Sequence, residues 1–267
     1  MLSNLSRSLT YLNALFYAIT GSVLYFFPEA IAPVFAWKVT AFMTMTIGGW
    51  CLGNAWLAWI TAQRWNWTLV RSSLLYLWVF GLLETLVLFA FRAKIVLEHP
   101  IAWLYLITLG VNLFTAIYGF IDWLRNRPAY VLSDEQLSSR QRILVIAFVL
   151  FAGFLGVYGS TAQAGAFGTN GGIFPEVMSL FTLRSFGVFY LSLAIGVLPY
   201  IWDGNRRSLL HHSFASFGFI VIITIAAFVY FSLFNFSTHP GGLLYFGAYI
   251  GIGIPLALTF RKFGTGS

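Results

Sequence analysis

The chain has 267 residues, of which 59% are hydrophobic, 19% are aromatic and only 9% are charged. A soluble domain carries about a quarter charged residues, so this chain has too few of them to cover a soluble surface. Cys51 is the single cysteine, which excludes a disulfide-linked secreted scaffold. The composition therefore predicts a polytopic membrane protein.

Eight apolar stretches are long enough to cross a bilayer, which takes about 20 mainly apolar residues per helix. Strands of a membrane barrel would alternate apolar and polar residues, and these continuous runs do not. We therefore predict an all-α bundle of about eight transmembrane helices. The stretches are 9–27, 40–61, 69–91, 101–124, 143–161, 180–202, 208–234 and 243–260.

The cations in the loops predict the orientation of the chain. If the N-terminus is cytoplasmic, eleven of the 15 Lys and Arg residues lie on the cytoplasmic side and four on the other side. The positive-inside rule then places both termini in the cytoplasm, and we expect a bacterial cytoplasmic (inner) membrane. The cations are scattered over short loops, so they predict contacts with anionic membrane lipids and no binding of nucleic acid.

Similar motifs recur in the same order in both halves of the chain. The patterns are F-P-E, F-x-x-[KR] and H-P-x-x-x-L-Y, which begin at residues 27, 35 and 99 and again at residues 174, 181 and 239. We predict two parallel four-helix repeats, 1–124 and 143–267, joined by a cytoplasmic polar linker at 125–142. In the linker, Ser133-Asp134-Glu135-Gln136 matches a helix capping box, which predicts that the fifth helix begins before the bilayer. The glycine-rich segment 163–172 is an insertion in the second half.

The repeated motifs place six polar residues on the outer face of the membrane. They are Glu29, Lys38, His99, Glu176, Arg184 and His239. The structural interpretation is that they accompany prolines at helix starts, where a missing N–H has no effect and a carboxylate is favourable. The functional alternative is a symmetric outer site that combines a carboxylate, a cation and an imidazole from each half.

The two imidazoles of these motifs suggest a third interpretation. His99 and His239 are candidate ligands for a haem or a chlorophyll-type cofactor. Two histidines without cysteines or clustered carboxylates are few ligands, so we predict no metal site.

Glu84 lies inside the third apolar stretch. A carboxylate inside a membrane is expensive and usually faces the protein interior or an aqueous cavity. The structural interpretation is a protonated side chain, or one bonded to Asn13, Asn54 or Asn112, that fixes helix packing. The functional interpretation is coupling to a proton or a substrate. A second ionisable residue at this depth is missing, so the sequence outlines no proton relay.

Two G-x-x-x-G motifs predict close helix crossings. They are formed by Gly49 with Gly53 and by Gly247 with Gly251, and each contact could lie within the chain or with another subunit. Pro199 stands late in its apolar stretch and predicts a kink.

The sequence contains no catalytic pattern of the Ser-His-Asp, H-E-x-x-H, G-x-S-x-G or C-x-x-C type, so we expect no enzyme. Our first hypothesis is a non-catalytic integral subunit that packs against other integral subunits of a larger membrane complex, for example an energy-converting one. The second is a small secondary transporter with its site at the pseudo-two-fold axis between the repeats. The third is a subunit that binds a haem or chlorophyll-type cofactor.

Overall fold

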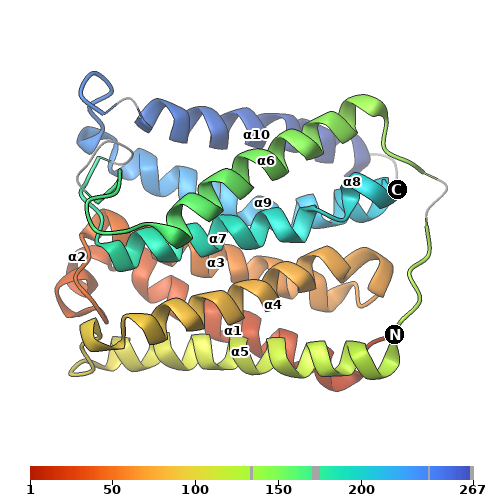
Figure 1. Ribbon diagram of the computed structural model, residues 1–267, viewed down its shortest axis with the longest axis horizontal. Helices are drawn as coiled ribbons and strands as arrows, with labels where there is room; N and C mark the ends of the chain where they lie inside the picture. Colours follow the sequence, from red (N-terminus) through yellow and green to blue (C-terminus); the bar gives the residue numbers. More distant parts are fainter. Residues whose placement is uncertain (133–134, 170–174, 240, 265–267) are drawn as a thin grey trace.

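The computed structural model describes residues 1–132, 135–169, 175–239 and 241–264. These residues form an all-α polytopic bundle, and no strand occurs among them (Figure 1). Its long helices are α1 (Asn4–Phe26), α3 (Ala41–Gln63), α4 (Trp67–Ala90), α5 (Pro100–Asn126), α6 (Ser139–Thr161), α7 (Leu180–Val197), α9 (Arg206–Val229) and α10 (Gly241–Gly264). Two short helices, α2 (Pro28–Ile31) and α8 (Tyr200–Asp203), lie in the connections.

Seven helical stretches of the described chain are long and apolar enough to cross a membrane. They include α7 together with α8, and they leave out α3. Helix α3 is as long as its neighbours, but its mean hydropathy is below that of the other seven stretches. The all-α membrane bundle is therefore confirmed, whereas eight membrane spans stay a prediction.

Polar side chains set the starts of six long helices. Each accepts a hydrogen bond from a backbone N–H of the first turn, which satisfies a group that has no partner inside the helix. The six capping residues are Ser3, Thr40, Asn66, Ser138, Ser179 and Asn205.

The start of α6 differs from the sequence prediction. Its capping box is formed by Ser138 and Gln141, and the helix begins at Ser139. The predicted box began at Ser133, which with Asp134 lies outside the described residues. Around Pro199 the long helix is interrupted, because α7 ends at Val197 and α8 begins at Tyr200, while Leu198 and Pro199 between them keep right-handed helical backbone angles. The predicted kink at Pro199 stays a prediction.

The first four long helices lie on one side of the bundle and the last four on the other (Figure 1). Helix α1 begins and α10 ends at the same end of the bundle, which we call the terminal end; α2 lies at the opposite, distal end (Figure 1). The two halves meet where α3 packs on α9 and where α4 packs on α7 and α9. At the α4–α9 contact, Ser73 Oγ and His212 Nδ1 are 2.9 Å apart.

The two G-x-x-x-G motifs have different surroundings. Gly53 lies so close to the ring of Phe219 in α9 that an added Cβ atom would overlap the ring, and Gly49 lies against Ile223. The first motif therefore makes a close crossing between the halves. A Cβ atom at Gly247 or Gly251 of α10 would meet no described atom within 4 Å.

Candidate functional site

Glu84 lies on α4 and is 1% exposed. Its Oε1 accepts a hydrogen bond of 3.2 Å from the hydroxyl of Tyr105 on α5. Its Oε2 has no hydrogen-bond partner in the described part of the chain. The hydroxyl of Ser185 on α7 lies beside the carboxyl group but does not reach hydrogen-bond geometry, and it is also unpaired. The carboxyl group is therefore only half satisfied.

A small cavity of about 10 Å³ lies next to Glu84, between α1, α3, α4 and α5. This volume is enough for about one water molecule. Its walls include the rings of Tyr17, Trp50 and Tyr105 and the thiol of Cys51. The site thus combines a carboxylate with aromatic walls in the interior of the bundle.

Two further polar side chains on the cavity wall lack partners. Both the Oδ1 and the Nδ2 atoms of Asn54 are buried without a hydrogen bond, as is Nε1 of Trp50. Asn54 is 1% exposed and Trp50 is 5% exposed. An unsatisfied buried polar group destabilises a fold by about 1–3 kcal/mol, so a cluster of them calls for an explanation.

No cation of the described chain faces Glu84. The titratable groups that interact with its carboxyl are the phenols of Tyr17, Tyr76 and Tyr105 and the thiol of Cys51. An unpaired charge is very costly in a low-dielectric interior. The carboxyl group must therefore carry a proton or a bound cation.

The expected asparagine partners of Glu84 are not found. Asn13 Nδ2 donates to Asn112 Oδ1 at 2.9 Å, and Asn112 Nδ2 donates to the Tyr17 hydroxyl at 2.9 Å. Asn54 lines the cavity and lies beside the Tyr76 hydroxyl, but it reaches hydrogen-bond geometry with no described group. The expectation of an asparagine bond was wrong because Tyr105 takes that place. The sequence did hold a signal, since Tyr105 ends the repeated H-P-x-x-x-L-Y motif.

The two repeated glutamates gather at the distal end. Glu29 Oε1 accepts from the Tyr230 hydroxyl at 2.9 Å, and Glu176 Oε2 accepts from the Thr40 hydroxyl. Burial raises the pKa of Glu176, the hydrogen bond from Thr40 lowers it, and the nearby Glu29 carboxylate raises it further. Burial and the bond to Glu29 also raise the pKa of Tyr230. Each contact joins one half of the chain to the other.

The cations of the repeated motifs do not occupy equivalent places. Lys38 precedes α3, whereas Arg184 lies inside α7 and donates two hydrogen bonds, of 3.0 and 2.9 Å, to the carbonyl oxygen of Ala162. Glu29 stands in the first turn of α2, but Glu176 lies in the connection before α7. The interpretation of both carboxylates as helix-start residues is therefore wrong for Glu176, and the cations do not converge as matched partners.

The histidines of the repeated motifs have local surroundings. His99 takes the N-cap position of α5 as expected, but its side chain makes no cap bond. His239 Nδ1 lies 2.9 Å from the Thr238 hydroxyl. The described residues contain no group of three His, Cys, Asp or Glu side chains able to hold a metal ion. Cofactor binding at His99 or His239 stays a prediction.

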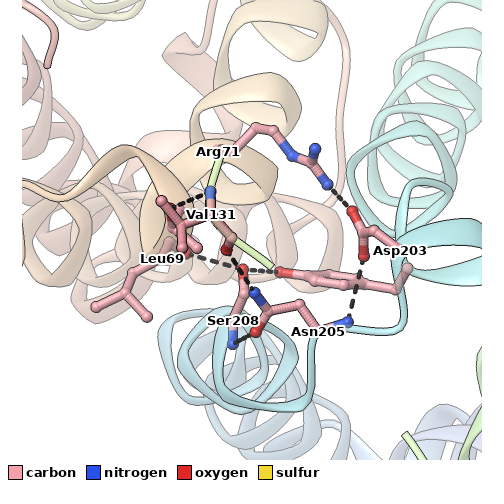
Figure 2. Close-up of polar contacts among 8 residues, drawn as sticks. Leu69, Arg71, Val131, Asp203, Asn205 and Ser208 are labelled. Atoms are coloured by element: carbon pink, nitrogen blue, oxygen red, sulfur yellow. Dashed lines mark hydrogen bonds and ion pairs between the residues drawn. The ribbon is translucent and has the colours of Figure 1, made fainter. Parts of the chain in front are cut away.

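An ion pair links the two halves at the terminal end (Figure 2). Arg71 at the start of α4 pairs with Asp203 at the end of α8, and both side chains are mostly buried. The Arg71 guanidinium also lies 3.9 Å from the ring centre of Tyr130 in the linker. Burial raises the pKa of Tyr130, and the charge of Arg71 acts in the opposite direction.

Hydrogen bonds around this ion pair tie the linker to α9 (Figure 2). Asn205 caps α9 at the N–H of Ser208, 3.0 Å away, and its Nδ2 donates to the Val131 carbonyl at 3.4 Å. The Ser208 hydroxyl lies 2.9 Å from the Tyr200 hydroxyl and donates to the Leu69 carbonyl at 3.4 Å. Sequence reasoning missed this cluster, because its members stand far apart in the chain.

Comparisons with known proteins add no family to this description. No family model, no curated protein and no solved structure matches the chain.

Proposed function

We propose that the chain is a small secondary transporter whose substrate site is the cavity beside Glu84. The observation that supports this is a buried carboxylate oxygen, a buried amide and a buried indole N–H that share one cavity and lack partners. Roughly nine in ten buried polar groups in proteins have a hydrogen-bond partner, so three unpaired groups on one cavity are unusual. Ser185 brings the second half to the edge of the site, so the site adjoins the α4–α7 contact between the halves.

The contacts at both ends of the bundle support a closed, occluded arrangement. At the distal end, Thr40 bonds to Glu176 and Tyr230 bonds to Glu29. At the terminal end, Arg71 pairs with Asp203. All three contacts run between the halves. In alternating access, the halves would rock about the central site and open one end at a time.

We also propose that the halves are parallel repeats with both termini in the cytoplasm of a bacterial cell. The caps of α3 and α7, Thr40 and Ser179, are 139 positions apart, and so are Asn66 and Asn205, the caps of α4 and α9. Ser73 and His212, which bond across the contact, have the same separation of 139. The excess of cations in the loops of the terminal end supports the orientation.

Cys51 allows a test of transport that needs no known substrate. It is the single cysteine, it lines the cavity, and it is 4% exposed. In sided membrane vesicles, a small membrane-impermeant thiol reagent applied on either side should modify Cys51 slowly, because alternating access exposes the cavity to each side in turn. Cys51→Ser supplies the background. Modification from neither side, or from one side alone, would contradict the proposal.

A second candidate is the non-catalytic subunit of a larger membrane complex. The observation that favours it is α10, where Gly247 and Gly251 meet no other described part of the chain. Such a motif permits close approach of another helix. Extraction in a mild detergent should then retain integral partners, and Gly251→Leu should release them while leaving the chain folded. A chain that purifies alone would exclude this role.

A further inference from the structure

We propose that the cavity beside Glu84 binds one small monovalent cation, Na⁺ or an ion of similar size, in exchange for a proton. The proposal rests on the proposed transport function and names the substrate of that site, with the proton as the ion exchanged for it. It starts from the isolation of the Glu84 carboxyl group, which is 1% exposed and has one oxygen without a partner.

Charge balance permits two states of this site. The groups that face Glu84 are Tyr17 from α1, Cys51 from α3, Tyr76 on α4 itself, Tyr105 from α5 and Ser185 from α7. None of them carries a positive charge, and none is a second carboxyl group. A buried carboxylate of this kind is neutralised by a proton or by a bound cation.

The exchange step is balanced in atoms and charge. In the proton-loaded state, Glu84 is a carboxylic acid. When the cation enters, the O–H bond breaks, its electron pair stays on the carboxylate, and the proton leaves to water on the side from which the cation came. The negative charge of the carboxylate is balanced by the proton before the step and by the cation after it. Nothing is oxidised or reduced.

The ligand atoms of the site fit a hard monovalent ion. Glu84 Oε2 and Asn54 Oδ1 are unpaired oxygens of residues that line the cavity, and the unpaired Ser185 hydroxyl lies beside the Glu84 carboxyl group. Hard cations prefer oxygen ligands. The described residues hold no group of three His, Cys, Asp or Glu side chains, which disfavours a transition metal.

The size of the cavity limits the ligand. At about 10 Å³ it accepts an ion or molecule the size of one water. An organic cation such as choline does not fit. The proposal therefore predicts that Li⁺ and Na⁺ compete for one site and that choline does not compete.

Binding of radioactive Na⁺ to the purified full-length chain in detergent tests the proposal. We expect saturable binding of one ion per chain at alkaline pH, with choline chloride holding the ionic strength constant. Glu84→Gln keeps the shape and the acceptor for Tyr105 but cannot carry a negative charge, so it should lose this binding. Glu98→Gln is the matched control, because Glu98 is exposed in the connection before α5, and it should bind like the wild type.

A second variant tests the site if Glu84→Gln does not fold. Asn54→Leu removes one oxygen ligand and leaves Glu84 in place, and it should weaken Na⁺ binding about tenfold, as expected for loss of one charge-assisted contact. Thermal unfolding of each variant checks that it is folded. Absence of saturable binding in the wild type, or unchanged binding in folded Glu84→Gln, would overturn the proposal.

Flux measurements separate this inference from the transport function. In proteoliposomes that contain a pH-sensitive dye, a Na⁺ gradient should drive proton movement in the opposite direction, and Glu84→Gln should reduce it to the level of protein-free vesicles. Specific Na⁺ binding without any flux would support the cation site and contradict the transport function. Protein-dependent flux that depends on neither Na⁺ nor Glu84 would support the transport function and contradict the cation site.

Discussion

Two buried carboxylates, Asp122 and Glu84, have opposite surroundings. Asp122 near the end of α5 is 6% exposed and accepts four hydrogen bonds. They come from the Ser3 N–H at 2.8 Å, the Ser3 hydroxyl at 2.9 Å, the Ser6 hydroxyl at 2.6 Å and the Asn126 amide at 2.6 Å. Glu84 is 1% exposed and accepts one bond, of 3.2 Å.

This difference separates an anchoring role from a binding role. Asp122 joins the first turn of α1 to the last turns of α5, and its donors satisfy the charge without a cation. Glu84 is left with a free oxygen, a cavity and an unpaired Asn54. A protein that needed Glu84 only for packing would gain stability by replacing it with an apolar residue. Substitutions at the two carboxylates should therefore have different effects on stability and on Na⁺ binding.

The largest effect is expected at Asp122. Asp122→Ala leaves the donors of Ser3, Ser6 and Asn126 without their acceptor, so the free energy of unfolding should fall by about 3 kcal/mol. Chemical unfolding in detergent measures the loss. Na⁺ binding to the fraction that stays folded should be unchanged. Loss of Na⁺ binding with unchanged stability would reverse the roles of the two carboxylates.

Tyr105→Phe should act on the other carboxylate. The substitution removes the one donor to Glu84, so the anionic form is less stable and Na⁺ must displace a proton that is held more tightly. The half-saturating Na⁺ concentration should rise about fivefold, in line with loss of about 1 kcal/mol. Tyr118→Phe on the same helix is a control, and its titration should match the wild type. Equal titrations for Tyr105→Phe and the wild type would show that this hydrogen bond does not act on the site.

Asp203 is a carboxylate of a third type, because its negative charge is neutralised by the guanidinium of Arg71. Arg71→Gln should lower the free energy of unfolding by about 1 kcal/mol, because both side chains are partly exposed at 21% and 14%. A double-mutant cycle with Asp203→Asn isolates the interaction. If the pair closes the terminal end, Arg71→Gln should also speed the modification of Cys51 from that side. An unchanged rate of Cys51 modification would contradict the proposal that this ion pair closes the terminal end.

The smallest effect concerns Glu176. Its pKa is raised from the ordinary value of 4.5, so the folded chain binds this proton more tightly than the unfolded chain. The carboxyl group therefore adds stability at low pH, and the contribution is lost as the pH rises through the raised pKa. The melting temperature of the wild type relative to Glu176→Gln should fall from about pH 4 to about pH 7. A constant difference would contradict the shift.

The sequence predicted the helices well because the bilayer restricts the options. Long apolar runs have one stable form, and the predicted stretch 101–124 agrees with α5 (Pro100–Asn126) to within two residues. The end of the seventh long helix was less accurate. The run 208–234 contains no Asp, Glu, Lys or Arg, but α9 ends at Val229 and the chain continues as a short 3-10 turn. Hydropathy alone does not detect such a change of backbone geometry.

The site was predicted only in part. Glu84 was visible because a carboxylate is rare in an apolar stretch. Its partner Tyr105 was visible only as the last residue of a repeated motif, and the motif does not show that Tyr105 faces Glu84. Glu29 and Glu176 were visible as repeated motifs, yet they differ in position, since one stands in α2 and the other in a connection. Short motifs give the order of residues along the chain, whereas helix packing decides which of them meet.

The central claim is that Glu84 exchanges a proton for a cation, and proton release measures it most directly. Na⁺ is added to the purified chain in a weakly buffered solution with a pH indicator, at constant ionic strength. We expect release of one proton per Na⁺ bound by the wild type and by Glu98→Gln, and no release by Glu84→Gln. Binding of Na⁺ by the wild type without release of a proton would contradict it.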